Sequence, residues 1–216
     1  LPFYPWTSDA GFSVVDFREV KNALGDWGHL QSLKKNYRLV FDCVINHVSQ
    51  SSAYVKGHLE KDPRYIDFCI EHEPTFDDSN VTRPRTGPLY HAYQGSRGKA
   101  MLWTTFSEDQ VDLNYTNPKV LIELLDVLLF YASKGASMIR LDAIAYMWKE
   151  SGTNCVHRPQ THAFIRIVRI LFDLAAPHVN ILSETNVPHH ENLKYFGDQG
   201  DESQIIYNFT LAPLIL

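Results

Sequence analysis

Polar side chains capable of acid–base or nucleophilic chemistry occur at the ends of four short apolar segments of this chain. The four groups are Asp42, Asn46 and His47; Arg140 and Asp142; Glu184 and Asn186; and Asn208. If the apolar segments are parallel strands of one sheet, the strand ends meet at one edge and the polar groups converge there, although they are far apart in sequence. The sequence therefore predicts one polar site built from four segments.

The carboxylates Asp142 and Glu184 have the composition of a glycosidase pair. In such a pair one carboxylate attacks the anomeric carbon and the other protonates the leaving oxygen. Arg140 precedes Asp142 by two residues, so in a strand both side chains point to the same face, and the guanidinium is expected to keep the aspartate ionised. An ordinary ion pair at a strand end is the alternative that spacing alone leaves open.

The strands that would position these groups are expected at residues 38–47, 137–143, 180–186 and 204–209. These segments lack the alternation of apolar and polar residues that is typical of strands with one face in water. We therefore expect a parallel sheet covered on both faces. A barrel and an open doubly wound sheet both fit, but no glycine-rich phosphate turn follows any strand, which disfavours a nucleotide-binding fold.

Two helices are expected between the strands. Asn117 and Pro118 supply a cap and a first-turn proline, leucines then repeat at helical spacing, and Gly135 suits the end of the helix. A second amphipathic helix is expected over about residues 159–176. Its apolar face comprises Phe164, Ile167, Val168, Leu171 and Phe172. Alternating strands and helices are typical of an α/β fold.

Residues 48–114 interrupt this pattern with scattered aromatic residues and the run RPRTGP. The stretch shows little periodicity, and a structureless loop of this length is uncommon in a compact domain. We therefore expect an inserted lobe that contains short elements of its own or acts as a lid.

The composition is that of a globular protein. The chain has 216 residues, of which 44% are hydrophobic and 21% charged, with a formal net charge of -5. No basic cluster favours nucleic acid or an anionic membrane, and no apolar run approaches the roughly 20 residues of a membrane helix. Cys43, Cys69 and Cys155 have no metal-ligand spacing, which predicts reduced thiols in a cytoplasmic protein.

Four segments in order along the chain resemble conserved segments of the α-amylase superfamily of glycoside hydrolases (glycoside hydrolase family 13). They are DCVINH (42–47), QVDLN (110–114), IRLDA (139–143) and SETN (183–186). Within that superfamily, the opening LPFYP with SDAGFSVVDFREV, the run RPRTGP, and LDAIAYMWKESGTNC are similar to the sucrose phosphorylase subfamily, which includes glucosylglycerate phosphorylases. The resemblance covers essentially the whole chain.

The resemblance implies a partial (β/α)8 TIM barrel with an inserted B-type lobe after its third strand. Leu1 would lie near the end of strand two, with Asp42 on strand three, Asp142 on four, Glu184 on five and Asn208 on six. The implied domains are barrel at 1–47, inserted lobe at 48–114 and barrel at 115–216. Strands one, seven and eight have no counterpart, nor has the superfamily's third catalytic carboxylate, so we expect a middle portion of a larger enzyme.

The resemblance also assigns roles to individual residues. Asp142 would be the nucleophile, Glu184 the general acid/base, and Arg140 the group that orients and charges the nucleophile. The positions that match the glucose subsite are Asp9, Phe12, His47, Gln110 and Tyr146. Each has an ordinary alternative: His47 could satisfy a buried carbonyl, Asp9 could be a turn residue, and Phe12 and Tyr146 could be core aromatics. Asp42 and Asn46 are expected to hold loops rather than contact substrate.

The implied mechanism is double displacement with retention, in which inorganic phosphate releases the glucosyl group from the enzyme as α-glucose 1-phosphate. Arg85 matches a phosphate-contacting arginine of the subfamily, with Arg83 as the adjacent alternative and a solvated arginine pair as the ordinary one. The segment after Asp142 is AIAY, whereas calcium-dependent amylases carry a lysine–histidine pair there, so no metal is expected. No cofactor is expected either.

The function expected is phosphorolysis of a small α-glucoside, either sucrose or glucosylglycerate, by a cytoplasmic enzyme. The segments AIAYMWKESGTNC and ETNVPH are slightly closer to the glucosylglycerate type. An α-glucoside hydrolase or transglucosidase, or an inactive amylase-fold binding module, are the alternatives. The expected partners are the glucoside and inorganic phosphate, without nucleic acid or membrane.

Overall fold

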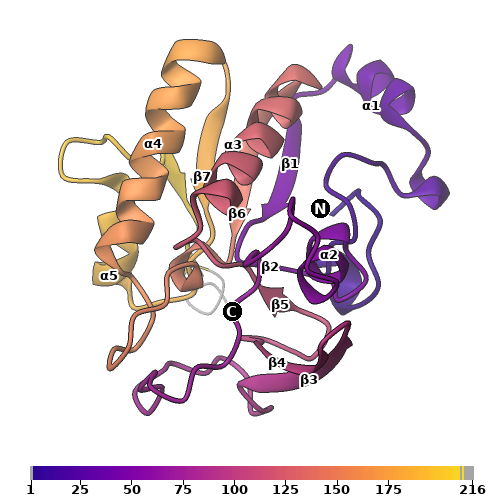
Figure 1. The fold of residues 1–216 in the computed structure, drawn as a ribbon. Coiled ribbons are helices and arrows are strands. Elements are labelled where there is room, and N and C mark those ends of the chain that lie inside the picture. Colours follow the sequence, from indigo (N-terminus) through magenta and orange to yellow (C-terminus); the bar gives the residue numbers. More distant parts are fainter. Residues whose placement is uncertain (1, 210, 212–216) are drawn as a thin grey trace.

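A parallel sheet forms the centre of the fold in the computed structural model, which describes residues 2–209 and 211 (Figure 1). Its strands are β1 (Leu39–Val44), β6 (Ala136–Asp142), β7 (Asn180–Ser183) and β8 (Ile205–Ile206), in that spatial order and all parallel. Because neighbours in the sheet are also consecutive among the predicted strands, the chain winds in one direction around the sheet, as in a barrel. The α/β prediction is confirmed.

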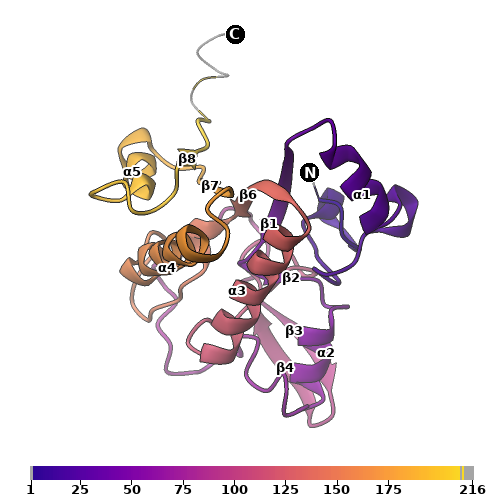
Figure 2. The ribbon, with the colours of Figure 1, turned by 90° about the horizontal axis from the view of Figure 1, so that it is seen from above.

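Two long helices cover one face of this sheet side by side (Figures 1 and 2). Helix α3 (Pro118–Ser133) begins where Asn117 accepts a hydrogen bond from the Lys119 backbone N–H at 3.0 Å, with Pro118 in the first turn. The helix ends before Gly135, whose φ of 99° suits the residue after a helix. Both ends agree with the prediction.

Helix α4 (Pro159–Ala175) also lies where the sequence predicts it, but its buried face is rotated from the predicted one. Phe164, Ile165, Val168 and Phe172 are buried, whereas Ile167 is 41% exposed. Residues 165, 168 and 172 lie on one face at helical spacing, and Ile167 falls outside that face. The apolar face predicted for this helix therefore wrongly included Ile167, which is exposed. Each buried side chain of this size contributes about 1.5–3 kcal/mol to folding.

The inserted lobe has short elements of its own, as expected. Helix α2 (Ala53–Leu59) is followed by an antiparallel hairpin of β3 (Tyr90–Gly95) and β4 (Gly98–Trp103). At the base of the lobe, β2 (His47–Val48) pairs with β5 (Val111–Asp112) in antiparallel orientation. This pairing brings the two ends of the lobe together, so His47 and Gln110, at the entry and exit, become neighbours.

The remaining elements are short. Near the start of the chain they are the 3₁₀ helices Asp9–Gly11 and Asn22–Leu24 and helix α1 (Trp27–Lys34); later come the 3₁₀ helix Ile144–Tyr146, helix α5 (His189–Leu193) and the 3₁₀ helix Lys194–Phe196. A bridge between Trp6 and Val14 closes the loop that carries Asp9 and Phe12. Leu1, expected near the end of a strand, lies outside the described residues.

Three strands are shorter than predicted. β1 covers Leu39–Val44 instead of 38–47, and His47 belongs to the separate strand β2. β7 stops at Ser183 instead of residue 186, although the Glu184 backbone N–H still bonds the Leu141 carbonyl at 3.1 Å. β8 covers Ile205–Ile206 instead of 204–209. Cys43, Cys69 and Cys155 are free and buried. Over the described residues, no helix combines the length and apolarity needed to cross a bilayer.

Candidate active site

A cavity of about 470 Å³ lies at the carboxyl ends of the central strands, and it is lined by all nine residues predicted for the site. These are Asp9, Phe12, His47, Arg85, Gln110, Arg140, Asp142, Tyr146 and Glu184. Pro84, Phe106, Ala143, Thr185 and Asn186 complete the lining. Residues from six separate segments therefore converge on one space, while the roles assigned to them stay predictions.

The register of the sheet places Arg140 between two carboxylates. In the pairing of β1 with β6, Asp42 lies opposite Arg140, and residues two apart on a strand share a face. The Arg140 guanidinium accordingly donates to Asp42 and lies 2.8 Å from Asp142 Oδ1. All three side chains are at most 14% exposed. Asp42 does not line the cavity, so it holds the arginine, in agreement with its expected supporting role.

Glu184 faces Asp142 from the next strand. Leu141 pairs with Ser183, and the Glu184 backbone N–H bonds the Leu141 carbonyl at 3.1 Å. Glu184, the first residue after β7, therefore lies beside the end of β6 that carries Asp142. The Ala143 backbone N–H donates to Glu184 Oε2 at 3.1 Å. Ala143 has a φ of 53°, a left-handed conformation that is uncommon for residues other than glycine. The turn that ends β6 thus aims a backbone donor at the neighbouring carboxylate.

The electrostatics of Asp142 differ from the expectation. Its pKa is raised to about 7, chiefly by burial and also by the charges of Glu184 and Asp42, while Arg140 opposes the rise. A single guanidinium shared with Asp42 does not offset the loss of hydration and the two neighbouring carboxylates. Arg140 thus acts on Asp142 in the predicted direction, but burial outweighs it and the pKa lies above the ordinary value of an aspartate.

The opposite wall of the cavity is built from loops. Gln110 Nε2 donates to Asp9 Oδ2 at 2.9 Å and to the Phe12 carbonyl at 3.1 Å, and Gln110 Oε1 accepts from Ser107 at 2.7 Å. The amide is therefore fixed in one orientation, with its donors aimed at the residues of the first loop. Gln110 is 1% exposed, so these bonds hold the wall without competition from solvent.

His47 is a neutral imidazole in this wall. Burial lowers its pKa to about 4. Its Nε2 lies 2.9 Å from the Phe12 carbonyl and 3.1 Å from Gln110 Nε2, and its Nδ1 lies 3.2 Å from Asn46 Nδ2. Because the Gln110 N–H groups also have Asp9 and the Phe12 carbonyl as acceptors, a proton on Nε2 that is donated to the Phe12 carbonyl fits these contacts. His47 thus does satisfy a buried carbonyl, as the ordinary alternative held, and it also lines the cavity.

A buried ion pair secures the base of the lobe behind this wall. Lys149 Nζ lies 2.7 Å from Asp112 Oδ2, and their side chains are 5% and 0% exposed. The same ammonium donates to Asn46 Oδ1 at 3.1 Å and to the Tyr146 carbonyl. It joins the end of β1, strand β5 and the turn after β6, so it positions Tyr146. Asn46 bonds Asp112 at 3.0 Å and also contacts His47, and it does not line the cavity, in agreement with its expected role in holding loops.

Arg85 enters the cavity from the lobe and pairs with Asp9 at 3.2 Å. The two side chains are 50% and 30% exposed, so the contact is a solvated one and is readily exchanged for other partners. Arg83, the alternative from the same run, donates instead to the Gly87 carbonyl and does not line the cavity. The structure therefore favours Arg85 over Arg83 as the arginine of this site.

Two further residues extend or limit the sequence prediction. Asn208, at the fourth predicted strand end, is exposed and lies outside the cavity lining. Phe106 was missed; its ring lies 5.0 Å from that of His47 and 5.3 Å from that of Tyr146. The only signal in the sequence was its position four residues before Gln110, because an aromatic residue in a loop has no periodicity.

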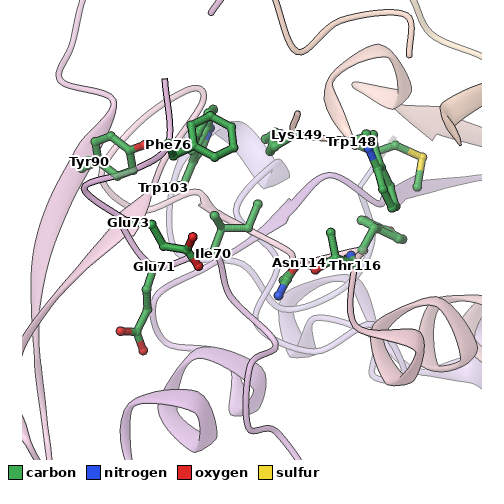
Figure 3. Close-up of a pocket in the computed structure, with 12 residues that line it drawn as sticks. Ile70, Glu71, Glu73, Phe76, Tyr90, Trp103, Asn114, Thr116, Trp148 and Lys149 are labelled. Atoms are coloured by element: carbon green, nitrogen blue, oxygen red, sulfur yellow. Dashed lines mark hydrogen bonds between the residues drawn. The ribbon is translucent and has the colours of Figure 1, made fainter. Parts of the chain in front are cut away.

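A second cavity, of about 200 Å³, lies between the lobe and the segment that follows β6 (Figure 3). Phe76, Tyr90 and Trp103 gather on one side of it and Trp148 lies on the other. It contains none of the nine predicted residues. The described part of the chain holds no group of three or more histidine, cysteine, aspartate or glutamate side chains that could bind a metal ion.

Comparison with known proteins identifies a family and several similar enzymes. Residues 1–215 match the family described as the catalytic domain of alpha amylase. A glucosylglycerate phosphorylase of Spirochaeta thermophila is 50% identical over 216 residues, which make up 100% of this chain and 37% of that protein. A sucrose phosphorylase of Streptococcus mutans is 32% identical over 229 residues, covering 100% of this chain and 46% of that protein.

The fold is shared with solved structures. The crystal structure of sucrose 6F-phosphate phosphorylase from Thermoanaerobacter thermosaccharolyticum matches with a TM-score of 0.82 at 24% identity, covering 97% of this chain and 45% of that one. The chain spans less than half the length of each of these proteins.

Proposed function

This chain belongs to the alpha-amylase family, as part of its (β/α)8 catalytic domain, and we propose that it carries the active site of a retaining α-glucoside phosphorylase. The observation that supports this most is the convergence of nine predicted residues on one cavity, with Asp142 at the end of β6 and Glu184 directly after the neighbouring strand β7. Two carboxylates on one cavity are what a retaining glycosidase uses as nucleophile and acid/base.

In the proposed first step, an ionised Asp142 carboxylate attacks the anomeric carbon of the glucoside. Glu184 gives its proton to the departing oxygen, so the glycosidic bond breaks as the glucosyl ester of Asp142 forms. Arg140, at 2.8 Å from Asp142, orients the nucleophile and favours its charged form. The wall of Asp9, His47 and Gln110 would hold the sugar hydroxyls, and the ring of Phe12 would pack against the glucosyl ring.

In the proposed second step, inorganic phosphate replaces the acceptor. Glu184, now ionised, takes a proton from the incoming phosphate, whose oxygen attacks the anomeric carbon and displaces Asp142 to give α-glucose 1-phosphate. Arg85 would bind the anion, because a guanidinium forms paired hydrogen bonds with phosphate. Its solvated contact with Asp9 is the one that phosphate or substrate would replace.

The proposed substrate is glucosylglycerate, with sucrose as the second candidate. The relative at 50% identity is named a glucosylglycerate phosphorylase, and the relative at 32% a sucrose phosphorylase. The pairing of β2 with β5 at the base of the lobe supports the division into barrel at 1–47 and 115–216 and inserted lobe at 48–114. We place the protein in the cytoplasm, on its three free thiols.

The test is a phosphate-dependence assay on the full-length protein that carries this chain. Glucosylglycerate and sucrose are each incubated with and without inorganic phosphate, and the products are followed by NMR. We expect α-glucose 1-phosphate from glucosylglycerate only when phosphate is present. Release of free glucose at the same rate without phosphate would instead support a hydrolase, and a new α-glucoside without phosphate would support a transglucosidase. Absence of any turnover, with sugar binding retained, would support an inactive binding module.

A further inference from the structure

Asp109 is a carboxylate that lies behind the loop wall of the cavity without lining it. It accepts hydrogen bonds from the hydroxyls of four residues and from one backbone N–H. The donors are Thr7, Ser8 (2.6 Å), Ser13 (2.9 Å), Ser49 (3.0 Å) and the N–H of Gln50 (3.2 Å). Five donors on one side chain are far more than an ordinary loop aspartate collects, and they come from two segments distant in the sequence.

Each donor is a close neighbour of a residue that lines the cavity. Ser8 precedes Asp9, Ser13 follows Phe12, and Ser49 lies two residues after His47. Asp109 itself precedes Gln110. One carboxylate therefore connects the three segments that supply the glucosyl-binding wall.

Two of the hydroxyls that donate to Asp109 are buried, so they depend on protein acceptors rather than on water. Ser13 and Ser49 are fully buried. Ser13 also donates to the Asp109 backbone carbonyl and Ser49 lies 2.7 Å from the Thr7 hydroxyl, so loss of the carboxylate removes the charged acceptor that these hydroxyls share. The hydroxyl bonds lower the pKa of Asp109 although burial opposes this, so the group is ionised at neutral pH. Charged acceptors form the stronger hydrogen bonds, which suits a group that must hold three flexible segments together.

We propose that Asp109 is the positioning residue of the glucosyl-binding wall, acting through Ser8, Ser13 and Ser49 on Asp9, Phe12 and His47. This inference rests on the proposed function, because it assigns the wall to the glucosyl group. Asp109 does not contact the sugar. Loss of the carboxylate should weaken binding of the glucosyl unit more than it slows the chemistry at Asp142 and Glu184, which the sheet holds independently.

The test compares Asp109→Ala and Asp109→Asn with the wild type in the full-length protein. We expect Asp109→Ala to raise the KM for the glucoside about tenfold, and to weaken binding of D-glucose, measured by calorimetry, by a similar factor, with kcat changed less. The KM of Asp109→Asn should lie between the values for the wild type and Asp109→Ala, because its amide oxygen still accepts from Ser49 and Gln50. If Asp109→Ala does not fold, Ser8→Ala removes one donor from a half-buried site and should show the same shift on a smaller scale.

The matched control is Glu202→Gln. Glu202 is likewise a carboxylate with several donors, although it is more deeply buried than Asp109: it is 1% exposed and binds Arg166 at 2.7 Å and His162 at 2.8 Å. It lies outside the cavity, so its loss should lower the melting temperature without changing the KM. If both Asp109 variants lower the melting temperature but keep the KM and the affinity for D-glucose within twofold of the wild type, the carboxylate has only a structural role and the proposal is wrong.

The two proposals fail in different ways. A wild-type protein that produces no α-glucose 1-phosphate overturns the proposed function, whereas D-glucose binding tests the wall without any turnover. Tenfold weaker D-glucose binding by Asp109→Ala would support the positioning role in either case. Unchanged D-glucose binding would overturn that role even in an active phosphorylase.

Discussion

The two walls of the cavity are held by different means. Arg140, Asp142 and Glu184 stand on a wall of parallel strands, where backbone register decides which side chains face each other. The other wall, with Gln110 from a loop and His47 from the two-residue strand β2, is held mainly by side-chain hydrogen bonds. The strand wall is thus as stable as the sheet, whereas the loop wall depends on a few buried polar contacts. We expect changes in the first to affect chemistry and changes in the second to affect binding and stability.

The largest effect should come from the strand wall. Asp142→Asn keeps the size and place of the side chain but removes the proposed nucleophile, so kcat should fall about 10⁴-fold while the glucoside still binds. Steady-state kinetics and calorimetry on the full-length protein measure the two quantities. Asp173→Asn, on the exposed side of α4, is the control and should leave both unchanged. Turnover by Asp142→Asn at more than a tenth of the wild-type rate would contradict the assigned role.

The next largest effect should come from the loop wall. Lys149→Met leaves Asp112 buried without a cation, and breaking a buried pair in this way costs about 3–5 kcal/mol. Chemical denaturation should show this loss. The double variant Lys149→Met with Asp112→Asn should recover part of it, because no charge is then left unpaired. Lys194→Met, at an exposed pair with Glu191, should change stability by less than about 1 kcal/mol. If Lys149→Met and Lys194→Met lose the same free energy of unfolding, the buried ion pair is no more important for stability than the exposed one, which contradicts the prediction.

A moderate effect concerns the pH dependence of the strand wall. With a pKa of about 7 for Asp142, kcat/KM should rise as the pH increases through 7, because only the ionised carboxylate attacks. Asp42→Asn removes a neighbouring negative charge and leaves Arg140 to Asp142 alone, so the rise should move to lower pH by about one unit. A profile that moves to higher pH in this variant would mean that Asp42 supports the ionised nucleophile.

The same pKa has the opposite consequence for folding. Because the pKa of Asp142 is higher in the folded protein than in the unfolded chain, its contribution to stability is complete below about pH 4 and is lost as the pH rises through 7. Melting temperatures of wild type and Asp142→Asn should therefore diverge between pH 4 and 7, with the variant gaining relative to the wild type. If the melting temperatures of the two proteins change in parallel with pH, the pKa of Asp142 in the folded protein is an ordinary one.

The smallest effect should come from a residue that belongs to neither wall. Asn117→Ala removes the side-chain cap of α3 and should reduce stability by about 1 kcal/mol. Its KM and kcat should stay at the wild-type values, which gives the baseline for reading the loop-wall variants. Asn117→Ser, which restores an oxygen acceptor, should return most of the stability. A changed KM would show that the loop wall responds to any loss of stability.

The difference between the strand wall and the loop wall also determined which residues could be predicted from the sequence. Strand-end residues such as Asp142 and Glu184 were found from apolar runs alone, because strand periodicity and parallel order determine where their side chains meet. Asp9 and Gln110 were reached only through the family resemblance, since loop contacts across 101 positions leave no local pattern. Asp109 was missed altogether, because nothing in its own neighbourhood shows that five distant donors meet there. The pKa of Asp142 was misjudged because it depends on burial, which spacing does not reveal.

The left-handed turn at Ala143 limits how this sequence can vary. The residue that follows the proposed nucleophile must adopt a positive φ to present its N–H to Glu184, and β-branched side chains do so only under strain. Glycine, alanine, asparagine or aspartate could occupy position 143 at little or modest cost, whereas valine or isoleucine would pull the amide away from the carboxylate. The side chain at this position contributes little itself, yet its shape determines which substitutions an evolving protein could accept beside its two carboxylates.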